Sequence, residues 1–277
     1  MRNQFGRVII RTATVAIGLW LAVATVTSQA PAYRAPRTPD GKPNFNGIWQ
    51  ALNTAYWDIE AHSAGPGPVL ELGASGAIPG GLGVVEGDGI PYKPEALAKK
   101  RQNYANRLKL DPEIKCYLPG VPRAMYMPFP FQLIQTQKYV MMIHEYAGAV
   151  RTIYMDDQKE APADSWMGWS NGRWEGETLV VDTTGFNESF WMDRRGLPHT
   201  EKLRTLERFT RTDSRTIKYE VTVDDPSAYT APWTSQFNLG WEAGTELFEY
   251  VCQEANYAHT LMVGDKTSVD RTSTIVP

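Results

Sequence analysis

Residues Ser165–Val223 read SWMGWSNGRWEGETLVVDTTGFNESFWMDRRGLPHTEKLRTLERFTRTDSRTIKYEVTV, and this stretch decides the fold. It is rich in β-branched and aromatic residues, and turn-forming residues interrupt it at short intervals. We therefore predict two antiparallel hairpins, joined by a polar loop that carries His199 and Glu201. The stretch indicates architecture more clearly than chemistry, because no motif within it fixes a reaction.

The first hairpin is predicted to turn at Asn171-Gly172. A two-residue type I′ turn needs positive φ at both central positions, and Asn-Gly meets this need best. The turn would set Trp169 opposite Trp174, as an aromatic cross-strand pair. After a further turn at Gly176, the run Thr178–Thr184 is predicted to form a strand.

The second hairpin has a register that can be argued from charge. A two-residue turn would place Glu207 opposite Glu220, and the two carboxylates would repel each other. A three-residue loop at Asp213–Arg215 instead pairs Arg208 with Glu220. Because side chains alternate between faces, Glu207 then shares the apolar face with Tyr219, where a carboxylate needs a partner.

Further strands are predicted on either side of these hairpins. A meander covers residues 131–136, 139–146 and 150–155, and a last strand covers 247–253. Many short strands with tight turns favour an all-β, mainly antiparallel fold, either a barrel or a sandwich. Gly47-Ile48-Trp49 resembles the G-x-W of the lipocalin-like superfamily. We therefore expect a lipocalin-like β-barrel of about eight strands, wide enough for one small ligand.

Residues 51–130 depart from a simple barrel and are predicted to be an insertion packed on it. Gly and Pro crowd residues 65–91, which indicates a long loop. Residues 94–110 are predicted to be helical, with a short apolar stripe of Leu97, Tyr104 and Leu108. The basic residues of this helix are expected to face solvent: Lys99, Lys100, Arg101, Arg107 and Lys109.

Residues 1–32 have the pattern of a signal peptide. Three arginines precede an apolar run that is short for a membrane span, and Ala30-Pro31-Ala32 offers a cleavage site. The alternative is an uncleaved anchor, and both predict a periplasmic or secreted single domain at residues 33–277. Removing three arginines and no acid changes the net charge from −3 to −6, so we expect no nucleic-acid partner.

The chain has two cysteines, Cys116 and Cys252. In an oxidising compartment a disulfide between them is the expected state, and two buried thiols are the alternative. No histidine stands at ligand spacing from either, and the four histidines show no H-x-H or H-E-x-x-H spacing. We therefore expect no metal and no cofactor.

Residues 172–183 read G-R-W-E-G-E-T-L-V-V-D-T. This run resembles the pattern G-R-W-E-G-[DE]-T-L-V-V-D-T of a family of exported bacterial proteins, and the likeness extends over most of the chain after residue 32. The resemblance implies export and one domain, and it brings no activity with it.

Acid–base groups are the best candidates for chemistry. We predict Glu207, His199 and Asp182 as proton carriers, because carboxylates and histidines that face an apolar cavity acquire shifted pKa values. The candidate substrate-binding residues are His144, Arg151, Trp174 and Tyr219. The alternative is a buried ion-pair network of these carboxylates with Arg151, Arg204 or Arg208.

The predicted function is cofactor-independent acid–base chemistry, of the isomerase or lyase type, on a small hydrophobic or aromatic molecule. Many tryptophans and tyrosines in the C-terminal half suit such a ligand. The alternative is a non-catalytic carrier of a similar ligand. A serine hydrolase is a weaker alternative: residues 168–172 match G-x-S-x-G around Ser170, but that mechanism needs a strand-to-helix elbow, and a hairpin is predicted here.

Overall fold

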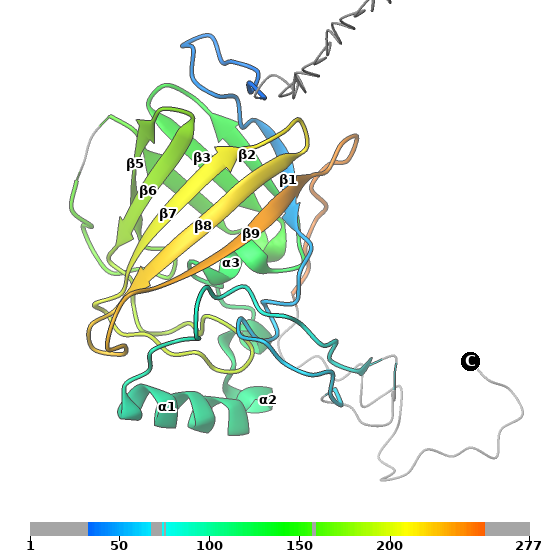
Figure 1. Cartoon of the computed structure of the whole chain (residues 1–277), viewed down its shortest axis with the longest axis vertical. Helices are drawn as coiled ribbons and strands as arrows, with labels where there is room; N and C mark the ends of the chain where they lie inside the picture. Colours follow the sequence, from blue (N-terminus) through cyan, green and yellow to red (C-terminus); the bar gives the residue numbers. More distant parts are fainter. Residues whose placement is uncertain (1–32, 68–73, 75, 157–158, 253–277) are drawn as a thin grey trace, which may run out of the picture. The chain divides into compact units, whose positions relative to one another are not determined.

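A computed structural model describes residues 33–67, 74, 76–156 and 159–252. Its centre is a closed β-barrel of nine strands in which each strand pairs with the next along the chain and β9 pairs with β1 (Figure 1). The predicted all-β barrel is therefore confirmed. The predicted signal peptide lies outside the described residues.

The strands are β1 (Gly47–Ala51), β2 (Phe131–Gln135), β3 (Tyr139–His144), β4 (Val150–Tyr154), β5 (Trp169–Glu175), β6 (Thr178–Thr184), β7 (Arg204–Arg211), β8 (Thr216–Asp224) and β9 (Trp233–Trp241). All neighbours are antiparallel except β4 and β5, which run parallel. The barrel is therefore mixed. The parallel pair is possible because residues 155–168 form a connection long enough to return to the starting end of β4.

The second hairpin has the predicted register. Arg208 lies opposite Glu220 and Phe209 lies opposite Tyr219. Glu207 is fully buried, whereas Arg208 and Glu220 are half-buried on the outer face. The register that keeps Glu207 away from Glu220 is therefore the observed one, although the ion pairs on this face are Arg208–Glu175 and Lys218–Glu220.

The first hairpin turns elsewhere than predicted. Asn171 and Gly172 lie inside β5, and the chain turns at Gly176 and Glu177, where Gly176 has a φ of +60°. Trp169 consequently pairs with Thr184, and it does not face Trp174. Asn171 and Gly172 instead contact β4 and the loop that follows it.

Both residues contact that loop and the strand before it. The Asn171 side-chain amide donates to the Lys159 carbonyl at 2.8 Å, and its oxygen accepts from the Lys159 amide at 3.3 Å. A Cβ on Gly172 would lie 2.5 Å from the Met155 sulfur and 2.6 Å from Ile153 Cγ2. Glycine is therefore required at residue 172 by close packing, and not by a turn.

The last strand of the barrel was also predicted in the wrong place. Residues 247–252 have no strand structure, and residue 253 lies outside the described residues. The ninth strand is instead β9, in which Trp233, Ser235 and Leu239 are buried. The polar Ser235 at an inward position interrupts the apolar alternation that would have marked this strand in the sequence.

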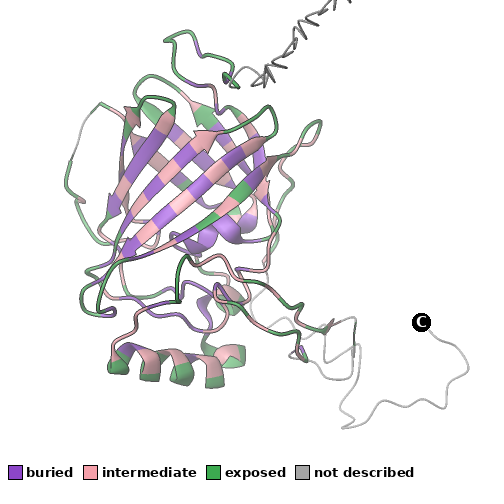
Figure 2. Cartoon of the chain, viewed as in Figure 1, coloured by how far each residue is buried: buried purple, intermediate pink, exposed green. Residues whose placement is uncertain are grey.

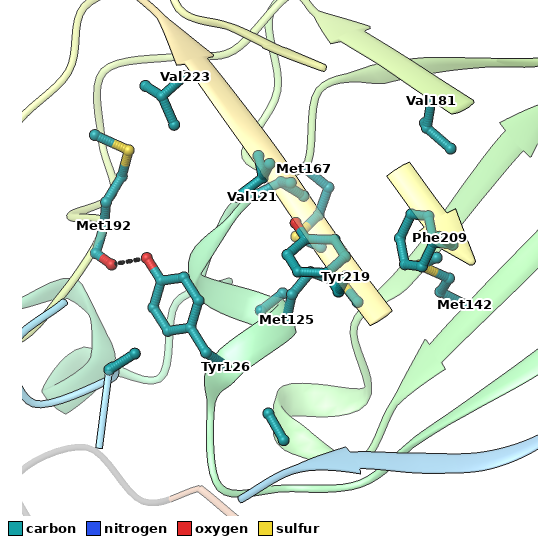
Figure 3. Packing of buried hydrophobic residues seen from close by; sticks show 14 of the residues in the cluster. Val121, Met125, Tyr126, Met142, Met167, Val181, Met192, Phe209, Tyr219 and Val223 are labelled. Carbon is teal, nitrogen blue, oxygen red and sulfur yellow. Dashed lines mark hydrogen bonds between the residues drawn. The ribbon is translucent and has the colours of Figure 1, made fainter. Parts of the chain in front are cut away.

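Side chains fill the barrel interior. Burial alternates along β7 and β8, as Figure 2 shows, so that every second residue faces inward. Phe209, Tyr219 and Met142 lie in one hydrophobic cluster with Met125 and Tyr126 from outside the sheet (Figure 3). The interior is thus a packed core, and not the open ligand cavity that a lipocalin-like fold would suggest.

The insertion lies at one end of the barrel. It contains α1 (Pro94–Ala105), α2 (Arg107–Leu110), the 3₁₀ turn η2 (Pro112–Lys115) and α3 (Arg123–Tyr126); a second 3₁₀ turn, η3 (Tyr146–Gly148), follows β3. All four residues of α3 are buried at the barrel end, and α1 and α2 lie below it in Figure 1. Residues 84–86 add a short antiparallel pairing to the first half of β9.

The predicted helix is present, but its apolar stripe is not what packs. Ala96 and Asn103 are the buried positions of α1, whereas Leu108 of α2 is 56% exposed. The amide of Asn103 donates to the Gly196 carbonyl at 3.0 Å, which ties α1 to the loop before β7. The buried Ala96 and the hydrogen-bonded amide of Asn103 therefore hold α1 against the rest of the protein.

Cys116 and Cys252 form a disulfide, as predicted, with a Cα–Cα distance of 5.6 Å. The bond joins the end of the insertion to the chain after β9, across 136 residues of sequence. No helix in the described part of the chain is both long and apolar enough to cross a membrane.

Candidate functional site

The barrel encloses a polar group that we call the interior cluster: Arg151, Ser170, Thr183, Glu207 and Tyr219. Arg151 Nη1 donates to Glu207 Oε1 at 3.0 Å, and its Nη2 contacts Glu207 Oε2. Arg151 Nε donates to Ser170 Oγ at 2.9 Å, and Nη2 donates to Thr183 Oγ1 at 2.8 Å. The Tyr219 hydroxyl donates to Glu207 Oε1 at 2.9 Å.

Strand alternation brings these residues together. Glu207 and Tyr219 face inward from β7 and β8, Ser170 and Thr183 lie opposite each other on β5 and β6, and Arg151 reaches them from β4. Arg151 and Glu207 had been predicted in different roles, as a substrate-binding and a catalytic residue. Within the barrel they are an ion pair, which is the alternative that the sequence left open.

The interior cluster is closed to solvent. The side chains of Arg151 and Glu207 are 1% and 0% exposed. Burial raises the pKa of Tyr219 well above its usual value, and the negative charge of Glu207 adds to this. Burial and the charge of Arg151 lower the pKa of His144 to about 3, so this histidine is neutral. The side chains of the interior cluster and of His144 are therefore buried, and the Nε2 of His144 has no hydrogen-bond partner among the described residues.

The other predicted carboxylate and histidine lie elsewhere. Asp182 is on the outer face of β6, where Arg204 Nε donates to it at 2.8 Å. His199 is buried in the loop before β7, and its two ring nitrogens lie 3.2 Å and 3.0 Å from the carbonyls of Thr200 and Phe190. Burial lowers its pKa. The structure therefore does not assemble Glu207, His199 and Asp182 into one site.

The remaining predicted residues are structural in their contacts. Trp174 stacks on Phe45, with ring centroids 5.5 Å apart and planes 7° from parallel. Ser170 lies inside β5 and contacts Arg151 and Thr183, so it does not stand on a strand-to-helix elbow. That arrangement gives no support to the serine hydrolase alternative.

A second group of charges surrounds an open pocket beside the insertion, which we call the arginine pocket. Its volume is about 550 Å³, and it is lined by residues 63–67, Ile78, Tyr104, Arg107 and Arg195. Tyr104 comes from α1, Arg107 from α2, and Arg195 from the loop between β6 and β7. Segments far apart in the sequence therefore form the pocket together.

Both guanidinium groups stack against one ring. Arg107 Cζ lies 4.2 Å from the centroid of the Tyr104 ring, and Arg195 Cζ lies 4.6 Å from it. Arg107 Nη1 also donates to the Tyr104 carbonyl at 3.0 Å. Stacking on an aromatic ring stabilises a guanidinium by about 0.5–1 kcal/mol at an exposed site and leaves its in-plane donors free for an anion.

Two carboxylates lie behind Arg195. Asp58 Oδ2 and Arg195 Nε form an ion pair at 3.0 Å, and burial raises the pKa of Asp58. Asp193 is fully buried and accepts from the amides of Leu197 at 3.0 Å and Ile59 at 3.3 Å. Burial, opposed by Lys100 and reinforced by Asp58, raises the pKa of Asp193 to about 6.

The insertion (residues 51–130) and the loop between β6 and β7 together form what we call the end layer of the barrel (Figure 1). This layer contains a buried ion-pair network. Arg123 Nη1 and Nη2 donate to Asp111 at 2.9 Å and 3.1 Å, and Nη2 also donates to Glu113 at 2.5 Å. Arg194 Nε donates to Glu113 at 2.7 Å. The neighbouring residues Arg194 and Arg195 therefore have different partners: Arg194 is paired with Glu113, and Arg195 with Asp58.

Most of the arginine pocket was not predicted from the sequence. Arg107 was expected to face solvent, and Asp58, Asp193 and Arg195 were not predicted as site residues. The run Asp193-Arg194-Arg195-Gly196 is a weak signal, since adjacent charges in a loop are usually solvent-exposed. Among the described residues, no three His, Cys, Asp or Glu side chains form a group that could hold a metal ion.

Comparisons with family models, with curated proteins and with solved structures gave no match to this chain.

Proposed function

We propose that this chain binds a small organic anion in the arginine pocket. The observation that carries the proposal is the pair of guanidinium groups, Arg107 and Arg195, stacked on Tyr104 at the wall of a pocket of about 550 Å³. Small-molecule sites commonly have volumes of roughly 300–1,000 Å³ and combine apolar walls with a few charged groups.

Arg107 supports an anionic ligand most directly. Among the described residues, its side chain has no carboxylate partner and makes one hydrogen bond, to the Tyr104 carbonyl. A guanidinium presents five donors in a planar fork that matches a carboxylate. Arg107 therefore retains donors for a ligand, while stacking on Tyr104 limits the side-chain entropy lost on binding.

The rest of the pocket suits the apolar part of such a ligand. Ala64, Pro66 and Ile78 contribute apolar surface to its lining. An aromatic or alicyclic carboxylic acid therefore fits better than inorganic phosphate. The hydrophobic or aromatic ligand predicted from the sequence is retained in this proposal, but its place moves from the barrel interior to the end layer, because packed side chains occupy the interior.

Acid–base catalysis is the second candidate function. It is favoured by Asp58 and Asp193, because the pKa values of both carboxyl groups are raised above those of ordinary carboxyl groups, and Asp58 is paired with Arg195, which lines the pocket. Under this candidate the chain is an isomerase or lyase acting on the bound anion. We further propose that the protein works outside the cytoplasm, with which its disulfide is compatible.

The test measures binding of benzoate and of its neutral analogue benzamide to the full chain by calorimetry. We expect benzoate to bind at least about tenfold more tightly, because a charge-assisted hydrogen bond contributes about 1.5–3 kcal/mol. Arg107→Gln should remove most of this difference. Arg101→Gln is the matched control, since Arg101 is an exposed residue of α1 outside the pocket.

Two outcomes would overturn the proposal. One is equal affinity for benzoate and benzamide, which would show that charge is not recognised. The other is a similar loss of benzoate binding in Arg107→Gln and Arg101→Gln, which would show that the effect reflects overall charge. Catalysis is tested separately, by following exchange of the α-protons of phenylacetate with solvent deuterium by NMR.

A further inference from the structure

Arg195 already has an anionic partner within the protein. Its Nε lies 3.0 Å from Asp58 Oδ2, and the two side chains are 29% and 11% exposed. The guanidinium also lines the arginine pocket, so an anion that enters the pocket meets a cation that is bound to a carboxylate. The ligand and Asp58 therefore compete for one guanidinium.

Asp58 stands in a region where negative charge is hard to accommodate. The charged groups that act on it are Lys100, Arg195 and His62, and its Oδ1 accepts from the Glu60 amide at 3.2 Å. Lys100 is itself bound to Glu60 at 2.6 Å, with the Tyr92 hydroxyl donating to the same carboxylate. The positive charge of Lys100 is thus shared between Asp58 and Glu60.

Asp193 adds a second negative charge next to the first. The amide of Ile59, the residue after Asp58, donates to Asp193, and each of the two carboxyl groups is affected by Lys100. The Asp193 side chain has no exposed surface, so water does not screen it. The charge of Asp58 helps to raise the pKa of Asp193, so we treat the two as one carboxyl pair, which is stabilised when it carries one negative charge fewer.

We propose that an anion bound in the arginine pocket takes Arg195 from Asp58, and that the Asp58–Asp193 pair binds a proton as this happens. The inference rests on the proposed function, since it concerns the same pocket. The ligand's charge replaces the charge that the carboxyl pair gives up, so the net charge of the layer changes little. Binding is thereby coupled to pH.

The sign follows from linkage. The carboxyl pair has a higher affinity for protons when the ligand is bound than when the pocket is free, so the complex holds more protons. Affinity for the anion therefore falls as pH rises through the range in which the free pair titrates, which includes the Asp193 pKa of about 6. For one proton, the change is at most about tenfold per pH unit.

The experiment counts protons directly. Benzoate is titrated into the full chain by calorimetry in two buffers of different ionisation enthalpy, between about pH 5.5 and pH 8, where a carboxylic acid of ordinary pKa stays ionised. We expect uptake of a substantial fraction of one proton per benzoate near pH 6.5, and an affinity that falls at least about threefold from pH 6 to pH 8.

Variants identify the group that takes the proton. Asp58→Asn should bind benzoate at least about threefold more tightly at pH 8 and take up fewer protons, because the competing carboxylate is gone. Asp193→Asn should reduce the uptake without this gain in affinity at pH 8. Asp88→Asn is the matched control, since Asp88 is an exposed carboxylate of the same insertion.

The outcomes separate the two proposals. If benzoate does not bind to the wild-type chain, the proposed function fails and this inference fails with it. If benzoate binds with no proton uptake in the wild-type chain, only the inference is overturned, whatever the variants do. Equal proton uptake in Asp58→Asn, Asp193→Asn and Asp88→Asn would also overturn it.

Discussion

The barrel interior and the layer at its end each contain an arginine–carboxylate pair, and the two pairs differ in burial. The Arg151–Glu207 side chains are 1% and 0% exposed, whereas those of Arg195 and Asp58 are 29% and 11% exposed. Exchange of a partner requires solvent or ligand to reach the charge. The buried pair is therefore closed to exchange, whereas the partly exposed pair can be reached, as the proposed function requires.

The surroundings of the two pairs reinforce this difference. Glu207 accepts hydrogen bonds from Arg151 and Tyr219. Arg151 also donates to Ser170 and Thr183, so each member of the interior cluster has hydrogen-bond partners within it. Asp58 has an ion pair with Arg195 and accepts one hydrogen bond, from the backbone amide of Glu60. The same two residue types thus stand in different environments, because neighbouring donors and solvent access differ.

The largest expected effect comes from breaking the buried pair. Glu207→Gln should lower the free energy of unfolding by about 3–5 kcal/mol, because it leaves the Arg151 charge buried without its carboxylate. Chemical denaturation monitored by circular dichroism measures the change. Replacing both residues together, as Arg151→Met with Glu207→Leu, should recover most of the loss.

Glu220→Gln is the matched control for this prediction. Glu220 lies on the outer face of β8, next to Lys218 at 3.0 Å, and its side chain is 28% exposed. We expect this change to cost less than about 1 kcal/mol. Equal losses in Glu207→Gln and Glu220→Gln would contradict the distinction between the barrel interior and its surface.

The disulfide joins the insertion to the chain after β9, and its loss is expected to have the second-largest effect on stability. Cys116→Ser with Cys252→Ser should destabilise the protein by about 2–4 kcal/mol, because the bond closes a long loop in the unfolded chain. The same denaturation experiment measures the change. Reducing agent should lower wild-type stability to the level of the double variant and leave that variant unaffected; a further loss in the variant would contradict the prediction.

The pH dependence of stability tests Asp193. Its pKa is raised to about 6 in the folded chain, and an unfolded Asp has a pKa of about 3.9. A group with a raised folded pKa binds more protons when folded, so its contribution to stability falls as pH rises from about 4 to 6. The fall is at most about 3 kcal/mol, and Asp193→Asn should remove it.

Asp88→Asn again provides the comparison, because Asp88 is exposed. Denaturation of both variants at several pH values isolates the Asp193 contribution from other groups, among them Glu60 and Glu113, whose lowered pKa values act in the opposite direction. If Asp193→Asn follows the wild-type pH profile between about pH 4 and pH 6, the carboxyl group does not titrate there.

The smallest effect concerns packing within the barrel. Gly172→Ala should cost about 1–2 kcal/mol, because its Cβ would lie 2.6 Å from Ile153 Cγ2. Gly240→Ala on β9 should be neutral or slightly stabilising, since the nearest atom to its Cβ would be Gln50 O at 3.8 Å. Thermal denaturation of both variants compares them, and a loss confined to Gly240→Ala would contradict the packing argument.

Local sequence was informative where a short-range rule had one solution. The register of β7 and β8 followed from charge repulsion between Glu207 and Glu220, and the structure has that register. The rule failed at Asn171-Gly172, where the best local turn signal lies inside β5. Contacts with Lys159 and Met155, from the preceding connection, outweighed the local preference.

The sequence by itself determined the barrel, the inward position of Glu207 and the pairing of the two cysteines. Alternation, turn residues and cross-strand charges act between near neighbours, and only two cysteines were present to pair. Tertiary structure alone decided that Arg151 meets Glu207, that Arg107 and Arg195 line one pocket, and that Asp58 pairs with Arg195. These contacts join distant segments of the chain. The difference in solvent access between the buried Arg151–Glu207 pair and the partly exposed Arg195–Asp58 pair arises only when the chain folds.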